Sequence, residues 1–453
     1  MELKNIAHTE RTLATGGFVL VINTDSTINP EALAMLAALH SRSIGGIKSH
    51  LEVLSDKGAD KFMSTYYVGY GHKSIGDCGS ATVFIEGVSM LAAKAIQDWP
   101  LYSGQEASTR YIDFAEQPFI DPLNTPETKE LQENWRTFYL KALDELQPVL
   151  KERFPLGKGE KEKTYNKAIA ARAFDTLRCF LPAGAGTNLA WHGNLRQFAD
   201  KLLVLRHHPL AEVREIAESV EDALIEAFPN SFDAEKKRFD RTEAYNGAMM
   251  SEFNYFDDVE PSEFSLAHDG VDHKLLASYK DALSSRPPKT ELPKMLSECG
   301  QVQFKFLLDY GSFRDIQRHR AATQRMPLLG VHHGFHPWYL NELPENLRAE
   351  ADTLIETQSK KIESLDTSPE VKQYYTAMGF NCTNRITGTL PALVYLAELR
   401  ATRFVHPTLR ERAQQMAATL EETYSQEGLV MHLDQEADRF DVKRGEQDIE
   451  MKS

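Results

Sequence analysis

The hydrophobic and polar positions of the chain form two similar series of elements. Residues 80–86 alternate between apolar and polar side chains, as in a half-buried strand, and residues 88–96 carry apolar side chains at helical spacing. Residues 301–308 alternate in the same way, and a helix-like segment then continues to Gln317. The pattern therefore predicts a strand followed by a helix, and it predicts this pair twice.

The two series also end alike. Helical runs cover 194–206 and 210–228 in the first series, and 389–400 and 409–420 in the second. Strand, helix, loop, helix and helix therefore recur at a period of roughly 200 residues, far longer than the unit of a solenoid repeat. We predict a duplicated domain.

The remaining patterns set the predicted domain boundaries. A strand at 18–22 and a helix beginning at Asn29-Pro30 precede the first series. Polar and charged residues fill the segment between the two series, and the chain ends in a highly charged run. We expect a first copy at 1–235, a linker at 236–262, a second copy at 263–434 and a charged tail at 435–453.

Composition narrows the class of protein. The chain has 453 residues, 42% of them hydrophobic, and a net charge of −15. An acidic surface disfavours a nucleic-acid or anionic-membrane partner, which needs a basic face. The four cysteines are far apart and form no Cys-x-x-Cys pair, as in a protein with reduced thiols. No signal segment or apolar run of membrane-spanning length is visible, so we expect a cytoplasmic protein.

One candidate binding segment follows the first predicted helix. Within residues 105–111, Glu106, Ser108 and Arg110 stand at alternating positions, so their side chains can point the same way along an extended loop. A hydroxyl and a guanidinium suit the oxygens of a nucleotide phosphate. The alternative interpretation is a polar surface loop.

A second candidate segment, Arg318-His319-Arg320, follows the predicted helix of the second series. Alone, three basic residues usually form a solvated patch. Their position after a matching strand and helix favours contact with an anionic or aromatic ligand. Gln324 and Arg325 are close enough in sequence to assist.

Joined, the two segments resemble the signature of the flavin-dependent thymidylate synthases. That signature reads Arg-His-Arg, two residues, Ser, then Asn-Glu, one residue, Ser, one residue and Arg-Tyr. Gln105 replaces the usual Asn, and Ser103 matches the preceding Ser. Gly71-His72-Lys73-Ser74 is similar to the family's Gly-His-x-Ser element, and Arg196 fits a nucleotide-reading arginine of the family.

Each half of the motif is degenerate in the other copy. Asp98-Trp99-Pro100 replaces the Arg-His-Arg of the first copy, and Pro391 is the counterpart of Arg196. In the second copy the Glu, Ser and Arg positions fall on Met326, Leu328 and Gly330. The two copies have therefore divided one site, and we expect its two halves to converge in one cavity.

The resemblance implies a fold and a reaction. The fold would be α/β (α+β type), with two tandem copies that each have a central mixed sheet and flanking helices. The enzyme would convert dUMP to dTMP by reductive methylation, with FAD as cofactor and with NADPH and methylenetetrahydrofolate as co-substrates. A homodimer would form a pseudo-tetramer with two working sites.

The resemblance also implies residue roles. Contacts to dUMP would come from Ser103, Glu106, Ser108, Arg110 and Arg196. Contacts to the flavin would come from Arg318, His319, Arg320 and His72. His72 and Arg196 are the candidate catalytic residues, although a structural histidine and a solvent-exposed arginine remain open alternatives.

Three further possibilities bear on function. A related flavoenzyme acting on another pyrimidine nucleotide would carry the same motifs. A non-catalytic nucleotide- or flavin-binding scaffold would explain their decay. The histidines of 332–336 have metal-like spacing, but Gly334 and Pro337 disfavour a helix and no acid or cysteine lies at a suitable distance, so we expect no metal.

Overall fold

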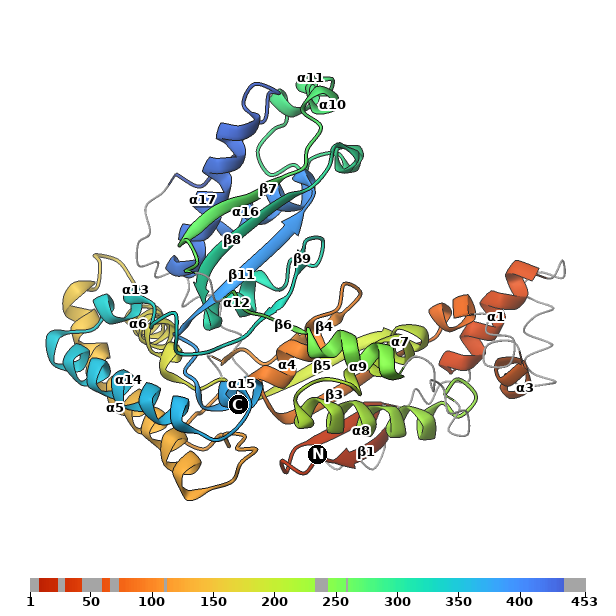
Figure 1. Cartoon of the computed structure of the whole chain (residues 1–453), viewed down its shortest axis with the longest axis horizontal. Helices are drawn as coiled ribbons and strands as arrows, with labels where there is room; N and C mark the ends of the chain where they lie inside the picture. The colour runs from red at the N-terminus through yellow and green to blue at the C-terminus, as the bar shows by residue number, and fades with distance from the viewer. Residues whose placement is uncertain are drawn as a thin grey trace. The chain divides into compact units, whose positions relative to one another are not determined.

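The computed structural model describes residues 8–22, 29–42, 59–65, 73–109, 112–232, 243–257 and 260–435 (Figure 1). By their contacts, these residues form two compact units that alternate along the chain. The first unit lies within residues 1–112, 118–120 and 185–253, and the second within 113–117, 121–184 and 254–453.

The first unit is built on a five-stranded sheet with the order β1-β2-β3-β5-β4. Its strands are β1 (His8–Thr12), β2 (Phe18–Ile22), β3 (Ser80–Ser89), β4 (Ser103–Glu106) and β5 (Gly186–Asn194). Its helices are α1 (Pro30–Arg42), α3 (Asp60–Phe62), η3 (Lys73–Cys78), α4 (Met90–Gln97), α7 (Leu195–Leu205), α8 (Ala211–Ala227) and α9 (Glu243–Ser251).

The second unit is built on a four-stranded sheet with the order β7-β8-β11-β9. Its strands are β7 (Phe264–Asp269), β8 (Val302–Asp309), β9 (Thr323–Gln324) and β11 (Asn381–Gly388), and β6 (Asn254–Tyr255) pairs with β10 (Met326–Pro327). The longer helices are α5 (Pro126–Arg153), α6 (Glu162–Leu177), α14 (Glu345–Ser364), α16 (Leu390–Arg400) and α17 (Pro407–Tyr424). The shorter ones are η5 (Arg178–Phe180), α10 (His273–Ala277), α11 (Lys280–Ser284), η6 (Lys294–Cys299), α12 (Tyr310–Ile316), α13 (Pro337–Glu342), α15 (Pro369–Lys372) and η7 (Gln373–Tyr375).

The two sheets repeat one topology, which confirms the predicted duplication of the fold. Strands β2, β3, β5 and β4 of the first sheet correspond in order and direction to β7, β8, β11 and β9 of the second. In each copy a short 3-10 helix precedes the long strand, and a helix follows it directly. Two helices follow the third corresponding strand, α7 and α8 after β5, and α16 and α17 after β11.

The predicted α/β fold class is confirmed, but one detail of the prediction is wrong. Within both large sheets every described pair of strands is antiparallel, whereas we expected mixed sheets. The alternation of apolar and polar residues in β3 and β8 is itself typical of antiparallel sheets with one face on the core. The parallel pairing is confined to the short β6–β10 pair.

Helices α5 and α6 come from the first half of the sequence but belong to the second unit. The buried Trp135 of α5 donates from Nε1 to the carbonyl of Tyr375 (2.9 Å). Gln358 of α14 donates from Nε2 to the carbonyl of Leu131 (2.7 Å). The compact units therefore differ from the two sequence copies, whose exact boundaries stay a prediction.

Both long strands lead directly into a buried helix. β3 ends at Ser89, whose hydroxyl accepts a hydrogen bond from the amide of Ala92 (3.0 Å) and caps α4. β8 ends at Asp309, whose carboxylate accepts from the amide of Ser312 (2.8 Å) and caps α12. Each cap satisfies an amide that the first turn of a helix leaves without a partner. The two copies therefore change from strand to helix at the same structural position.

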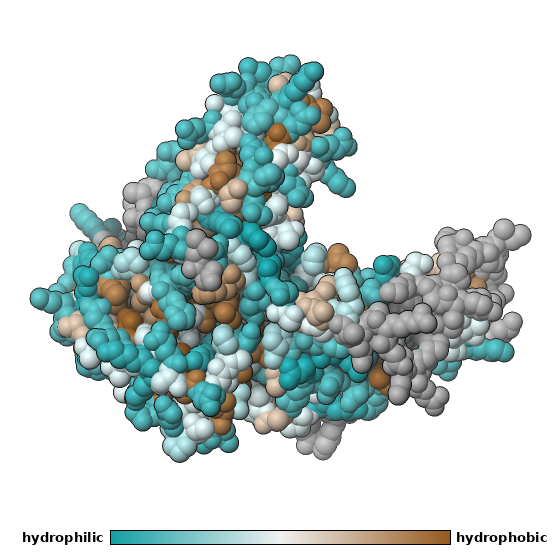
Figure 2. Space-filling model, in the orientation of Figure 1, coloured by the Kyte–Doolittle hydropathy of each residue, from teal (hydrophilic) through white to brown (hydrophobic). Residues whose placement is uncertain are grey.

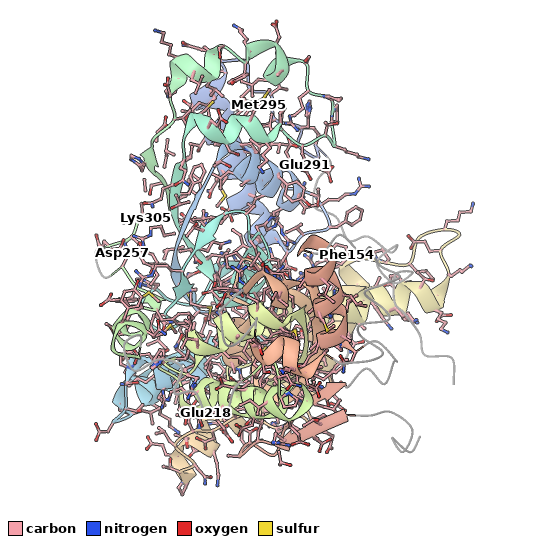
Figure 3. The ribbon with its side chains drawn as sticks, turned by 90° about the vertical axis from the view of Figure 1, so that its right-hand side faces the viewer. Phe154, Glu218, Asp257, Glu291, Met295 and Lys305 are labelled. Atoms are coloured by element: carbon pink, nitrogen blue, oxygen red, sulfur yellow. The ribbon has the colours of Figure 1, made fainter. Side chains whose placement is uncertain are left out.

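The side chains on the surface fit the composition. On the face shown in Figure 2 hydrophilic residues predominate, as expected for a chain with a net charge of −15. Lys305 of β8 forms an ion pair with Asp257 (3.1 Å), which follows β6, so this pair links the short parallel strands to the large sheet (Figure 3). No helix among the described residues is long and apolar enough to cross a membrane.

Gly17 offers a test of the first sheet. A Cβ atom at this position would lie 1.9 Å from the carbonyl oxygen of Glu86, next to the bulge at Gly87 (φ +69°). We expect Gly17→Ala to lower the free energy of unfolding by about 1–3 kcal/mol or more, because backbone atoms must move. Denaturant unfolding measures this change.

The control is Gly247→Ala in α9, where an added Cβ meets no atom within 4 Å. This variant should be as stable as the parent or more stable by about 0.5–1 kcal/mol, because alanine favours helix. Equal stability losses in both variants would contradict the close approach of Gly17 to β3.

Candidate active site

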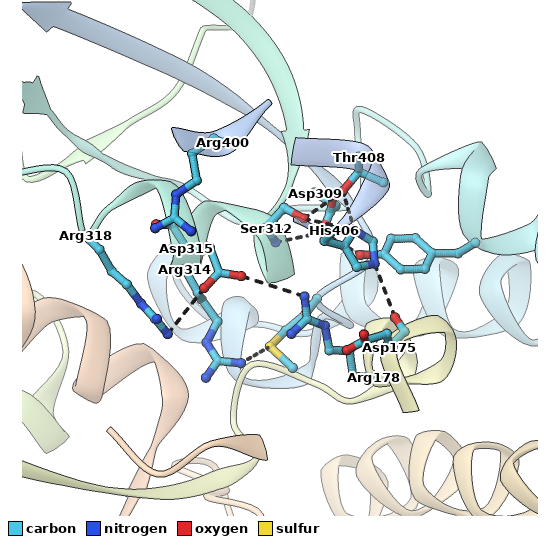
Figure 4. A network of polar contacts seen from close by, with 12 residues as sticks. Asp175, Arg178, Asp309, Ser312, Arg314, Asp315, Arg318, Arg400, His406 and Thr408 are labelled. Atoms are coloured by element: carbon cyan, nitrogen blue, oxygen red, sulfur yellow. Dashed lines mark hydrogen bonds and ion pairs between the residues drawn. The ribbon is translucent and has the colours of Figure 1, made fainter. Parts of the chain in front are cut away.

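The Arg-His-Arg segment directly follows α12 in the second unit (Figure 4). The Arg318 side chain is 58% exposed, and its guanidinium forms an ion pair with Asp315 (3.3 Å). His319 is buried, and Arg320 is half-buried. Of the three side chains, that of Arg318 is therefore the most accessible to a ligand.

His319 is held as a neutral imidazole. Arg400, at the end of α16, donates from Nε to Nε2 of His319 (2.7 Å), so Nε2 accepts and the ring proton lies on Nδ1. Burial, and then the charge of Arg400, lower the pKa of His319 to about 3. This histidine therefore positions the segment against α16 and carries no charge near neutral pH.

Asp315 is the carboxylate at the centre of this cluster. Burial alone would raise its pKa, but Arg178, Arg318, Arg400 and Arg314 together hold the pKa below its usual range. Arg178 comes from η5 and lies 3.9 Å from Asp315. Four guanidinium groups from three parts of the second unit thus share one carboxylate.

A buried polar network continues from Arg178. Asp309 accepts hydrogen bonds from Tyr339 (2.8 Å) and from the amide of Ser312, and Arg178 lies within electrostatic range of both Asp309 and Asp175. His406 contacts the hydroxyl of Thr408 (2.8 Å). Burial lowers the pKa of His406 to about 4. The four arginines and the three aspartates, Asp175, Asp309 and Asp315, leave one positive charge in excess.

In the first unit, Glu106 is the last residue of β4, and side chains of α4 contact its carboxylate. The Glu106 carboxylate forms a buried ion pair with Lys94 (2.5 Å) and accepts a hydrogen bond from Nε2 of Gln97 (2.9 Å). Lys94 also donates to Oε1 of Gln97 (3.2 Å). The predicted nucleotide-binding carboxylate is therefore already neutralised by a cation from its own copy.

The second copy has equivalent positions in its helix and loop, but it lacks that carboxylate. Counting from the caps at Ser89 and Asp309, Lys94 corresponds to Arg314 and Gln97 to Gln317. Gln317 now faces the thioether of Met326 (3.4 Å), the counterpart of Glu106. The predicted loss of the acidic contact in this loop is consistent with Met326 being buried.

The first copy places a cation beside its degenerate Asp98-Trp99-Pro100 segment. The ammonium of Lys201 in α7 donates to the carbonyl of Asp98 (2.8 Å) and lies 5.4 Å from the ring centre of Trp99. Burial lowers the pKa of Lys201 to about 8. Lys201 therefore places a cation beside this segment of the first copy, and no local motif marked it in the sequence.

The other predicted site residues have different environments. Ser103 begins β4 and is exposed, and Ser108 is exposed in the loop after it. Arg196 begins α7, is 40% exposed, and pairs with Asp77 (2.9 Å) and Asp200 (3.5 Å). His72 and Arg110 lie outside the described residues.

The structure thus brings Ser103, Glu106 and Ser108 together along β4 and its loop, and Arg318–Arg320 together after α12. The predicted convergence of these two groups in one cavity stays a prediction. The sequence reasoning missed Lys94, Asp315, Lys201 and Arg400. Asp315 lies one helical turn before Arg318, a spacing that indicates an ion pair, whereas Arg400 is distant in sequence.

The histidine-rich loop at 332–336 provides the N-cap of α13. His336 is the N-cap of α13, and its Nδ1 accepts from the amide of Trp338 (3.3 Å). Within the described part of the chain, no group of three or more metal-ligating side chains is close enough to hold an ion. All four cysteines lie in this part and are free thiols, three of them buried.

Comparison with known proteins identifies relatives of both halves. Residues 24–230 match the model of a family described as thymidylate synthase complementing protein. UPF0159 proteins of Chlamydia muridarum and Chlamydia pneumoniae are each 26% identical, over 88% and 75% of this chain and over 90% and 74% of theirs. A UPF0159 protein of Thermoplasma acidophilum is 22% identical over 84% of this chain and 90% of its own. These matches include parts of both halves of the chain.

A solved structure is also similar in part. The crystal structure of a UMP/dUMP methylase, PolB from Streptomyces cacaoi, bound with 5-Br UMP, is 18% identical and covers 49% of this chain and 93% of its own, with a TM-score of 0.28.

The Lys94–Glu106 pair gives a test of the first copy. Lys94→Met should lower the free energy of unfolding by about 3–5 kcal/mol, because it leaves the Glu106 carboxylate buried without its cation. Denaturant unfolding measures this loss.

The control is the double variant Lys94→Met/Glu106→Met, which places at position 106 the residue found at Met326 of the second copy. It should regain most of the lost stability. A double variant with the same loss of unfolding free energy as Lys94→Met would show that the Lys94–Glu106 ion pair does not determine the stability of the contact between α4 and β4.

The buried His319 gives a pH-dependent test. Its folded pKa of about 3 lies below the unfolded value of roughly 6.5, so between these pH values the unfolded chain binds one more proton. Stability from His319 is therefore present above pH ~6.5 and falls as the pH drops toward ~3. In His319→Gln, the slope of unfolding free energy against pH should decrease by up to about one proton in this window.

The matched control is His268→Gln on β7, where the histidine is exposed. This variant should keep the parent slope. Identical slopes in the parent and His319→Gln would contradict the burial of a neutral His319.

Proposed function

Because residues 24–230 match the model of the family described as thymidylate synthase complementing protein, we propose that the chain is a flavin-dependent thymidylate-synthase-like enzyme. The substrate would be dUMP and the product dTMP. Methylenetetrahydrofolate would supply the carbon, and FAD, reduced by NADPH, would supply the hydride. The observation that supports this most is the family match over the segment with the Glu106, Ser108 and Arg110 motif.

The arginine cluster of the second unit has the donor set that a flavin diphosphate needs. Arg318 presents an exposed guanidinium, and the cluster that includes it has four arginines and three aspartates, which leaves one positive charge in excess. Guanidinium groups bind phosphate oxygens in a bidentate manner. Arg318 would hold the cofactor, while Asp315 and the His319–Arg400 pair keep the segment in place.

The residues of the first copy would bind and orient the nucleotide. The exposed hydroxyls of Ser103 and Ser108 are available as donors to phosphate oxygens, and Glu106 is fixed at the end of β4 by Lys94. Arg110 would supply the guanidinium that binds the phosphate. Arg196 would bind the base, and it would first have to break its ion pairs with Asp77 and Asp200. His72 would lie beside the flavin. A fixed set of donors lowers the barrier by positioning the reactants.

We propose further that two chains associate as a homodimer, so that the halves of each site meet. A chain with decayed motifs can instead serve as a scaffold that binds a nucleotide or flavin without turnover, or act on another pyrimidine nucleotide. The experiment below separates these cases.

Flavin retention tests the assignment of the second copy. The purified protein should be yellow or bind added FAD, and Arg318→Ala should lose most of this binding, because it removes the exposed cation. Arg110→Ala should keep the flavin while raising the dissociation constant for dUMP about 10- to 100-fold, the loss of one charge-assisted contact. Flavin fluorescence and calorimetry measure the two ligands.

The control is Arg348→Ala in α14, an exposed arginine of the second unit. It should bind both ligands as the parent does. Formation of dTMP from dUMP, methylenetetrahydrofolate and NADPH separates the leading proposal from a scaffold or another substrate. A protein that binds neither flavin nor dUMP would exclude all three.

A further inference from the structure

The second sheet ends in an edge where the first sheet has a further strand. In the first copy β1 pairs with the outer side of β2, whereas β7, the counterpart of β2, pairs with β8 alone among the described residues (Figure 1). β1 begins at position 8 and β2 at 18, and β6 begins at 254 and β7 at 264, so β6 precedes β7 at the same spacing. β6 pairs with β10 instead. The segment that would cover the edge of β7 is therefore used elsewhere in the second unit.

The edge position leaves apolar side chains of β7 partly exposed. Phe264 and Leu266 lie opposite two buried phenylalanines of β8, so they point toward the core, yet both are only half-buried. In the first copy the core-facing Val19 and Val21 of β2, which lies beside β1, are 0% exposed. A strand added to β7 would remove further apolar surface from water at these two positions.

The backbone of β7 also presents hydrogen-bonding groups at this edge. The amide of Leu307 donates to the carbonyl of Glu263 (3.0 Å), so these residues form a hydrogen-bonded pair of β8 and β7. Pairs in an antiparallel ladder alternate, so the peptide groups of Phe264 and Leu266 point away from β8. A strand edge with outward-pointing peptide groups is a template for pairing with another strand.

A second copy of β7 fits this edge. A two-fold axis makes two β7 strands antiparallel, which is also the direction in which β1 joins β2. With Ser265 on the axis, Phe264 of each chain lies opposite Leu266 of the other. The outward peptide groups then meet as hydrogen-bonded pairs, and apolar side chains lie beside apolar side chains on the core face.

Charge and the bulge in β7 favour this register. With Ser265 on the axis, Glu263 lies opposite Ala267. With Leu266 on the axis, Glu263 would lie opposite Asp269, and like charges directly opposite each other are destabilising. The bulge that follows Leu266 interrupts the regular ladder at the end of the paired stretch.

We propose that the outer edge of β7 is a self-association surface, on which β7 of a second copy of this chain pairs antiparallel about Ser265. The two four-stranded sheets would form one continuous sheet across the axis. Main-chain hydrogen bonds give such strand addition its affinity, and the facing side chains give it specificity. A contact of one short strand is at the small end of specific interfaces, so we expect a dissociation constant in the micromolar range.

Cysteine crosslinking of the full chain tests the register. Cys78→Ser first removes the exposed native thiol and leaves three buried ones. In this background Ser265→Cys should form an intermolecular disulfide on mild oxidation. Facing Cα atoms of a non-hydrogen-bonded pair lie about 4.5 Å apart, within the range that a disulfide spans. Non-reducing electrophoresis measures the product.

The matched control is Ala267→Cys in the same background. Its two copies would be separated by about 13 Å along the paired strands, too far for a disulfide, so this variant should stay uncrosslinked. Absence of the disulfide in Ser265→Cys, or equal crosslinking of both variants, would overturn the proposal.

Leu266→Lys tests the surface in solution. A lysine on an edge strand opposes pairing, and here it also replaces an apolar contact, so the β7-dependent association should weaken at least about tenfold. The control is Leu156→Lys, which adds the same charge at an exposed leucine between α5 and α6 and should associate as the parent does. Analytical ultracentrifugation measures both. Equal association of the two variants would contradict the surface.

Amide hydrogen exchange of the unmodified chain gives an independent readout. Exchange across 263–267 should slow as the protein concentration rises, because pairing protects the outward amides. Exchange that is slow at every concentration would show that another part of the chain covers the edge. Exchange that is fast at every concentration would show that no strand binds there. Either result would refute self-association through β7.

This surface is independent of the site in the proposed function. The sheet order places β7 at the edge opposite β9, the strand that follows the Arg-His-Arg segment. The crosslinked Ser265→Cys protein should therefore bind FAD and dUMP as the parent does. A chain that forms this disulfide but binds neither ligand would refute the proposed function alone, and a chain that forms dTMP but never crosslinks would refute the surface alone.

Discussion

The capped junction between a long strand and a buried helix governs both copies of the fold. Ser89 and Asp309 end their strands and satisfy the first amides of α4 and α12. Each helix then runs through the core, so its last turn emerges at a fixed position beside the sheet. The residues that follow, Asp98 and Arg318, begin the segments that distinguish the two copies. The N-cap fixes where each helix begins. It therefore also fixes the position of the segment that follows the helix.

The copies diverged by changing the partner of a buried cation at equivalent positions. Lys94 is neutralised by Glu106 from a neighbouring strand. Its counterpart Arg314 joins the arginines around Asp315 on its own helix and faces the sulfur of Met378 (3.9 Å). A buried charge without a partner is strongly unfavourable, so the buried cation of each copy needs a carboxylate nearby. In the second copy, where Met326 replaces the acid, the buried arginine lies beside Asp315 instead.

The sequence predicted local elements well and tertiary partners poorly. Alternation in β3 and β8 and helical spacing in α7, α8, α16 and α17 follow from one-sided burial, which is visible within a short window. The assignment of α5 to the second unit depends on contacts such as Trp135 with Tyr375, which are distant in sequence. Lys201 and Arg400 could not be predicted for the same reason, since neither lies in a local motif.

The chain passes between the two units several times, since residues 121–184 belong to the second unit while 185–253 return to the first. During synthesis on the ribosome, α5 and α6 therefore emerge long before α14, the helix whose Gln358 binds the backbone of α5. Until then they lack part of their hydrophobic cover. A single cut of the chain therefore cannot separate the two compact units, because each unit is assembled from more than one stretch of sequence.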